Sequence, residues 1–230
     1  MLIEVQGVGH TYGQGSLART VLSDLNLVLA ESRIGVIGHN GSGKSTFVRM
    51  LNGLIQPTEG AVTVNGLSTV KQAKEVRKQV GFLFTDPDNQ IIMPTVGEDV
   101  AFGIRKLKLP KEEVRERVMA LLTPFGLADH YEHPAHLLSG GQKQLLALAS
   151  VLITEPNILV MDEPTTLLDL RNASMIGRRI AELNQNVILA THHLHLLEDF
   201  DRVLVFDNGR IVADDDPAPA IEYYRELMAC

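Results

Sequence analysis

The segment Gly38-His-Asn-Gly-Ser-Gly-Lys-Ser-Thr46 carries residue types that can bind the phosphates of a nucleotide. It contains the pattern G-x-x-x-x-G-K-[S/T], whose glycines let successive backbone N–H groups converge on a phosphate at a helix N-terminus. We expect Lys44 to reach the β- and γ-phosphates and the hydroxyl of Ser45 to hold Mg²⁺. The sequence therefore predicts a nucleoside triphosphate site, with nucleotide-binding residues Gly38, Asn40, Gly41, Ser42, Gly43, Lys44, Ser45 and Thr46.

Two carboxylates follow the apolar run at 158–161. The carboxyl end of a buried parallel strand faces the crevice in which ligands bind in open α/β sheets. We expect Asp162 to hold Mg²⁺, directly or through water, and Glu163 to polarise an attacking water as a general base. An acidic strand end alone is often a surface turn, but its pairing with a phosphate loop favours a catalytic interpretation.

A second glycine-rich segment, Leu138-Ser-Gly-Gly-Gln142, precedes a helical pattern at 143–153. A serine and two adjacent glycines at a helix start can present N–H groups to an anion. The same residues can simply cap the helix, and for S-G-G alone that interpretation is favoured.

Alternating strands and helices are expected to position these groups. Apolar runs predict strands at 33–38, 80–84, 158–161 and 187–190, and a hairpin at 202–206 and 210–213. Such buried strands, alternating with helices, predict a mostly parallel sheet covered on both faces. The first residues predict short strands at 2–5, 21–29 and 61–64, with Tyr12 in a turn. Helices are expected at 44–54, 71–78, 111–122, 172–183, 194–200 and 217–228, and a solvated turn at 214–216.

The order of these motifs resembles that of the ABC transporter ATPases, because L-S-G-G-Q lies between the phosphate loop and the I-L-V-M-D-E strand. The resemblance covers essentially the whole chain. It implies an α/β fold: an ABC-type P-loop NTPase with a mostly parallel core sheet, an N-terminal antiparallel β subdomain and an inserted helical subdomain. Residues 1–230 would form a single domain, with 1–85 and 151–230 in the core and about 86–150 in the helical subdomain.

The resemblance also implies roles for individual residues. Ser139, Gly140, Gly141 and Gln142 would complete the ATP site of a facing subunit, so that two chains enclose two ATP molecules. Tyr12 would stack on adenine, Asp169 would lie at the dimer seam, and His192 would contact the γ-phosphate and the attacking water. His192, His193 and His195 together also raise the alternative of a metal site, which is disfavoured because the sequence has no second ligand cluster.

One position departs from the family pattern. Where the family usually has a glutamine that ligands Mg²⁺ and reports the membrane partner, this chain has Thr85. Threonine keeps a hydroxyl but is shorter, so Thr85 is only a further candidate for the Mg²⁺ site, directly or through water. Hydrolysis is still expected because Glu163 and His192 are present.

The stretch Gly81 to Gly103 resembles the energy-coupling-factor branch of the family, which takes up vitamins, cobalt or nickel. The compact C-terminal part resembles the ATPase of the bacterial biotin transporter. The resemblance implies an integral membrane coupling protein and a substrate-binding membrane subunit as partners, at the cytoplasmic face of the membrane. Both half-sites of the chain look complete, so a homodimer is expected, and a heterodimer stays open as the alternative. The coupling protein would enter a groove that includes Asp86, Asp88, Gln90, Glu98 and Asp99.

Composition limits the alternatives. No window of 18 apolar residues suggests a membrane span, and the single cysteine, Cys230, excludes an internal disulfide, so a cytosolic protein is expected. The net charge of −7 argues against a nucleic-acid partner. Two other functions stay open: a soluble ATPase of the same fold that acts on DNA or ribosomes, and a nucleotide-dependent assembly subunit with little turnover.

Overall fold

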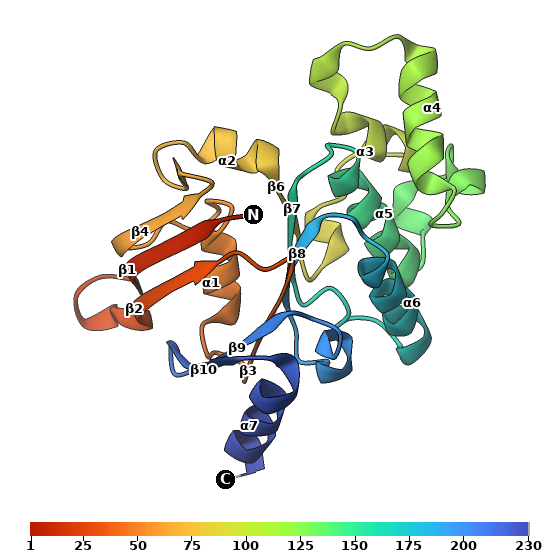
Figure 1. The fold of residues 1–230 in the computed structure, drawn as a ribbon. Helices are drawn as coiled ribbons and strands as arrows, with labels where there is room; N and C mark the ends of the chain where they lie inside the picture. The colour runs from red at the N-terminus through yellow and green to blue at the C-terminus, as the bar shows by residue number, and fades with distance from the viewer. Residues whose placement is uncertain (230) are drawn as a thin grey trace. The chain divides into compact units, whose positions relative to one another are not determined.

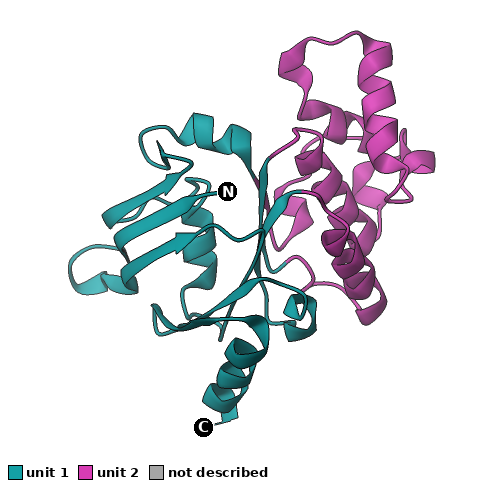
Figure 2. Ribbon diagram, in the orientation of Figure 1, with its two compact units in different colours: residues 1–80, 157–163, 185–230 teal, residues 81–156, 164–184 magenta. Residues whose placement is uncertain are grey.

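The computed structural model describes residues 1–229, so Cys230 lies outside the described residues. The chain forms two compact units, coloured separately in Figure 2. Unit 1 comprises residues 1–80, 157–163 and 185–230, and unit 2 comprises residues 81–156 and 164–184. The helical segment expected at about 86–150 lies within unit 2, which also includes the helix after Asp169.

An antiparallel sheet forms the N-terminal part of unit 1, with the strand order β2-β1-β4-β5. Its strands are β1 (Ile3–Tyr12), β2 (Arg19–Leu29), β4 (Glu59–Val64) and β5 (Leu67–Ser68). The prediction of a turn at Tyr12 is wrong, because β1 continues to this residue and pairs Tyr12 with Arg19 of β2. Gly7 and Gly9 interrupt the strand pattern in the sequence, so the full length of β1 was not predicted. The pairing of β1 with β2 shifts register between Val5 and Thr11.

The second sheet of unit 1 is mostly parallel, as predicted, and its strands run in the order β10-β9-β3-β8-β7. β3, β7, β8 and β9 are mutually parallel. They are buried almost throughout, which is why they read as continuous apolar runs in the sequence. β10 is an antiparallel edge strand. The bounds are β3 (Arg33–Gly38), β7 (Ile158–Asp162), β8 (Asn186–Ala190), β9 (Arg202–Asp207) and β10 (Arg210–Asp215).

Helix α1 (Lys44–Met50) contacts both sheets of unit 1, β2 on one side and β3, β7 and β8 on the other (Figure 1). Its buried residues include Phe47, Val48 and Met50, which fix the helix directly behind the phosphate loop. It ends four residues earlier than the predicted 44–54, where Leu51 to Gly53 form turns.

Two further helices belong to unit 1, α2 (Ala73–Gln79) and α7 (Pro217–Ala229). α7 packs on β3, β9 and β10 through Ala220 and Ile221, which are buried. The helix predicted at 194–200 is only a short 3₁₀ turn, Leu194–Leu197. Strand β6 (Val80–Leu83) leads from α2 into unit 2.

Unit 2 is helical, with α3 (Val96–Phe102), α4 (Lys111–Leu122), α5 (Gly140–Leu152) and α6 (Leu170–Ala181). α5 contacts α3, α4 and α6, and most of its residues are buried because the segment is apolar on nearly every face. Between residues 86 and 150 the structure has one isolated bridge, Thr95 with Pro134, and no strand. Among residues 1–229, no helix combines the length and the apolar character that a membrane span requires.

Candidate nucleotide-binding site

A cavity of about 400 Å³ in unit 1 opens beside the phosphate loop. Most residues predicted to bind the nucleotide line it, together with two residues that the motif did not indicate, Arg19 and Val21. Both lie on β2, close to Tyr12 across the strand pair, and only the pairing of β1 with β2 could reveal them. The lining residues are Tyr12, Arg19, Val21, Asn40, Gly41, Ser42, Gly43, Lys44, Ser45, Thr46 and Glu163.

The Lys44 side chain is folded back along the phosphate loop. Its Nζ donates to the carbonyl oxygens of Gly38 and His39, the latter at 3.1 Å. Burial lowers the pKa of this ammonium group, and the carboxylates of Glu163 and Asp162 offset part of that effect. The residue is therefore held as a nearly enclosed cation that can exchange carbonyl oxygens for phosphate oxygens.

Asp162 joins the end of β7 to helix α1. One carboxylate oxygen accepts from the hydroxyl of Ser45 at 2.7 Å, and the other accepts from Nε and Nη2 of Arg49 at 3.1 and 2.9 Å. Asp162 is fully buried, so the guanidinium compensates a charge that would otherwise be costly. No sequence motif indicated Arg49. It lies about one helical turn after the phosphate loop, and its side chain reaches Asp162 at the end of β7.

These contacts test whether the site suits Mg²⁺. A serine hydroxyl and a carboxylate oxygen 2.7 Å apart are hard oxygen donors of the kind Mg²⁺ prefers beside nucleotide phosphates. Ser45 and Asp162 therefore fit the predicted ion. Thr85 belongs to unit 2, directly after β6, and its part in metal binding stays a prediction.

Glu163 and His192 face each other where β7 and β8 end. The Nδ1 of His192 lies 2.7 Å from a carboxylate oxygen of Glu163, and the His192 backbone N–H donates to the same oxygen at 3.3 Å. Glu163 has a φ of 53°, in the left-handed region, and its own N–H donates to Ala190 at 2.8 Å. Such strain in a non-glycine residue clusters at functional sites, and here it accompanies a carboxylate at the cavity wall.

The neighbouring histidines do not form a metal cluster with His192. Within residues 1–229 no group of three or more His, Cys, Asp or Glu side chains is arranged to hold a metal ion. The rings of His192 and His193 are 4.2 Å apart between centroids. Burial, together with the charges of His192 and His195, lowers the pKa of His193, which favours its neutral form.

Tyr12 is half exposed at the rim of the cavity, with 44% of its surface accessible. Its hydroxyl lies 3.3 Å from the hydroxyl of Thr46 in the phosphate loop, and the ring of His10 packs edge-on against it at 4.4 Å between centroids. An exposed aromatic ring that is held from two sides offers a flat surface to a base.

In unit 2, Ser139 caps helix α5. Its hydroxyl accepts from the Gln142 N–H at 3.4 Å, and the Gln142 side chain accepts from the Ser139 N–H at 2.9 Å. In the single chain, Ser139 therefore acts as a helix cap, as the alternative interpretation of this segment predicted. Ser139 and Gly140 are nevertheless exposed. Binding of a phosphate by this segment stays a prediction.

Asp169 caps helix α6 in the same unit, because its side chain accepts from the Asn172 N–H at 2.8 Å. Gly141 packs against Asn172 so closely that a Cβ at position 141 would lie 2.5 Å from its amide. The second glycine of the segment is therefore needed for close packing between α5 and α6.

The five residues predicted for a partner groove have different environments. Asp99 is buried and accepts from the N–H groups of Ile92 and Met93 and from Ser150, so the prediction that it pairs with a partner is wrong. The Gln90 side chain is also engaged internally, with backbone groups of Phe84 and Ala147. Three are held near the surface: Asp86 caps a 3₁₀ turn, Asp88 pairs with Lys143 at 2.7 Å, and Glu98 closes a capping box.

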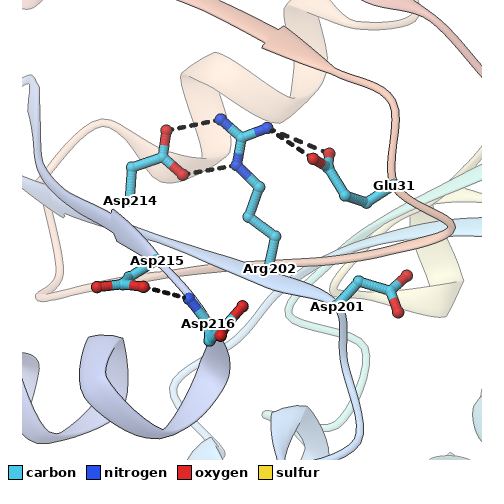
Figure 3. Close-up of a pocket in the computed structure, with 6 residues that line it drawn as sticks. All are labelled: Glu31, Asp201, Arg202, Asp214, Asp215 and Asp216. Carbon is cyan, nitrogen blue, oxygen red and sulfur yellow. Dashed lines mark hydrogen bonds and ion pairs between the residues drawn. The ribbon is translucent and has the colours of Figure 1, made fainter.

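A second cavity, of about 340 Å³, lies in unit 1 around Arg202 (Figure 3). Arg202 donates to Asp214 at 2.6 and 2.7 Å and to both carboxylate oxygens of Glu31 at 3.1 Å. These bonds to Asp214 raise the pKa of Arg202, against the effect of burial. The prediction of a solvated turn at 214–216 is wrong, because Asp214 and Asp215 belong to β10.

Comparison with known proteins agrees with this geometry. The family model described as "ABC transporter" matches residues 22–166. The chain is 48% identical to the biotin transport ATP-binding protein BioM of Rhizobium etli, over 100% of both chains. It is 42% identical to the energy-coupling factor transporter ATP-binding protein EcfA1 of Caldanaerobacter subterraneus, over 98% of this chain and 83% of that one. The solved structure of cbiO1 from Clostridium perfringens, part of the ABC transporter complex cbiONQ, superposes with a TM-score of 0.83 at 32% identity, covering 99% and 92% of the two chains.

Proposed function

We propose that this chain powers the uptake of biotin through membrane partners. The proposal proceeds from its family: the chain belongs to the ABC transporter family, as an energy-coupling-factor type ATPase. The observation that carries this proposal is the full-length similarity to a biotin transport ATP-binding protein. The cavity beside the phosphate loop supplies the ATP site on which the proposal depends.

The chemical step is transfer of the γ-phosphoryl group of ATP to water. Lys44 and the N–H groups of the phosphate loop hold the phosphates, and Glu163 takes the proton of the attacking water as its oxygen bonds to phosphorus. The bond from phosphorus to the ADP oxygen breaks, which gives ADP and phosphate. Ser45 and Asp162 would hold Mg²⁺, which when bound would supply positive charge near the phosphate oxygens. His192 positions the Glu163 carboxylate through their 2.7 Å contact.

Dimerisation of two copies is part of the proposal. Large apolar side chains are exposed on both sides of Asp169, with Leu167 63% and Leu170 90% accessible. Ser139 and Gly140 are exposed in the same unit. A second copy that covers these residues would remove the apolar surface from water and bring its Ser139 to an ATP phosphate.

The membrane partners are an integral coupling protein and a substrate-binding membrane subunit, at the cytoplasmic face of the membrane. Unit 2 has surface features that suit a docked helix, because Ile92 is 62% exposed and lies close in sequence to the carboxylates of Asp86 and Asp88. An apolar residue beside acidic groups fits an amphipathic helix that carries an arginine.

Purification of the tagged chain from detergent-solubilised membranes of its source tests this function. Recovery of two membrane proteins, with biotin bound to the smaller one and ATP hydrolysis above a Glu163→Gln control, is the expected result. Cobalt, nickel or another vitamin in place of biotin would contradict the proposed cargo but keep the motor. Recovery of the chain alone, or with nucleic acid or ribosomes, would contradict transport.

A further inference from the structure

The cavity beside the phosphate loop is lined by two positively charged side chains, and only one of them belongs to the loop. That one is Lys44, whose Nζ donates to the carbonyl oxygens of Gly38 and His39. The other is Arg19, the first residue of β2, which is exposed. The guanidinium of Arg19 forms no hydrogen bond or ion pair with any residue that the structure describes. Its charge is therefore available to a ligand of the cavity.

The pairing of β1 with β2 places Arg19 beside Tyr12. The two residues are register partners, and partners in an antiparallel pair project on the same face with Cβ atoms about 5 Å apart. Val21, two residues further along β2, also lines the cavity, as expected for side chains on one face of a strand. The hydroxyls of Thr11 and Thr20, 3.0 Å apart, hold the adjacent pair together. Arg19 therefore lies on the cavity wall next to the tyrosine ring.

The contact of Tyr12 with the loop indicates which part of a nucleotide Arg19 meets. The Tyr12 hydroxyl lies 3.3 Å from the hydroxyl of Thr46. With the base on the tyrosine ring and the β- and γ-phosphates at Lys44, the α-phosphate must lie between them, alongside Thr46. The long side chain of Arg19 reaches this position from the wall next to the ring, and a guanidinium presents paired N–H groups that match phosphate oxygens.

We propose that Arg19 is a nucleotide-binding residue whose guanidinium forms an ion pair with the α-phosphate. The phosphate-loop pattern contains no position on β2, so the motif does not assign this contact. ATP and ADP both carry this phosphate, so Arg19 strengthens the binding of substrate and product alike. The inference rests on ATP binding in the proposed function and adds a second phosphate-binding cation to that site.

Calorimetric titration of the purified chain with unlabelled ligands tests the contact. We expect Arg19→Gln to bind ATP, ADP and inorganic triphosphate each about fivefold more weakly than the wild type, as for an ion pair that stays partly exposed to water. The loss should shrink at high salt, because salt screens an exposed charge pair. Arg210→Gln, which removes an exposed arginine of β10 outside this cavity, is the matched control and should bind like the wild type. Thermal unfolding verifies that both variants are folded.

Each ligand separates one alternative from the proposal. Unchanged ATP affinity in Arg19→Gln would overturn it. Unchanged affinity for inorganic triphosphate, or a loss that does not depend on salt, would place Arg19 against the base and also overturn it. A loss for ATP without a loss for ADP would place the guanidinium at the γ-phosphate and contradict the α-phosphate contact. A wild-type chain that binds no ATP would contradict the proposed function itself, so the two failures are distinguishable.

Discussion

A carboxylate oxygen of Glu163 lies 2.7 Å from Nδ1 of His192, at the ends of two adjacent parallel strands. The contact forms although the residues are 29 positions apart, because β7 and β8 pair in register from Ile158 to Asp162. The backbone N–H of His192 donates to the same oxygen, so two groups of one residue hold this carboxylate in place. This preorganisation suits a general base.

The first prediction concerns Glu163→Gln. The amide keeps the shape of the side chain but cannot take a proton, so we expect ATP hydrolysis to fall about 100-fold or more while ATP affinity stays within about twofold. Hydrolysis is followed by phosphate release and affinity by titration with a fluorescent ATP analogue. Glu155→Gln, which replaces an exposed carboxylate in the other unit, is the matched control. Hydrolysis near the wild-type rate in Glu163→Gln would contradict the role of general base.

The second prediction concerns Tyr12. Loss of the ring in Tyr12→Ala removes a stacking surface, so ATP affinity should fall about tenfold, while Tyr12→Phe should bind within about twofold of the wild type. The phenylalanine variant also removes the 3.3 Å contact of the hydroxyl with Thr46 and so separates stacking from hydrogen bonding. Inorganic triphosphate has no base, and its affinity should be equal in all three proteins. Equal ATP affinity in Tyr12→Ala would show that the base lies elsewhere.

Much of the fold could be predicted because buried parallel strands are continuous apolar runs. The strand at 33–38 and the helix at 111–122 have the predicted bounds. β1 was harder to recognise, since glycines interrupt its pattern, and β10 was predicted to end early because the acidic residues Asp214 and Asp215 do not read as a strand. Arg202 of β9, 12 positions earlier in the chain, donates to Asp214 and stabilises the carboxylate there.

Some residues of the candidate site could be predicted from the sequence and others could not. Lys44, Ser45 and Asp162 could be predicted because each belongs to a short local motif, the phosphate loop or the acidic end of an apolar strand. Arg49 and Arg19 could not, since their place at the site depends on which strand lies opposite. Asp99 shows the reverse error: the sequence suggests a surface carboxylate, but the side chain is buried. It accepts from the nearby N–H groups of Ile92 and Met93 and from the hydroxyl of Ser150, which is 51 positions away.

The third prediction concerns the stability of unit 2. In Asp99→Ala the N–H groups of Ile92 and Met93 and the hydroxyl of Ser150 lose their common acceptor. Partly buried donors that lose their acceptor are costly, and three such donors are affected, so the free energy of unfolding should fall by about 3 kcal/mol. Urea unfolding followed by circular dichroism measures the change. Asp88→Ala, which removes a mostly exposed carboxylate, should cost less than about 1 kcal/mol. A similar loss in both variants would show that burial of Asp99 is not what matters.

The fourth prediction concerns acid stability at Glu31. Burial alone would raise the pKa of this carboxyl, but hydrogen bonds from the N–H groups of Glu31 and Ala30 and from Arg202 outweigh it, so its pKa is lowered in the folded chain. The unfolded chain then binds the proton more readily. This contribution to stability is fully present above the unfolded pKa and is lost as the pH falls through the folded pKa.

Glu31→Gln removes the titrating group and retains a side chain that can accept from Arg202. The variant should be less stable than the wild type at pH 7, and the difference should shrink as the pH is lowered through the acidic range in which carboxylates titrate. Thermal unfolding of both proteins between pH 7 and pH 3, limited to conditions where unfolding is reversible, measures this convergence. Glu116→Gln, an exposed carboxylate on α4, serves as the control and should follow the wild type at every pH. A constant difference between Glu31→Gln and the wild type across the range would mean that the folded and unfolded chains bind the Glu31 proton equally.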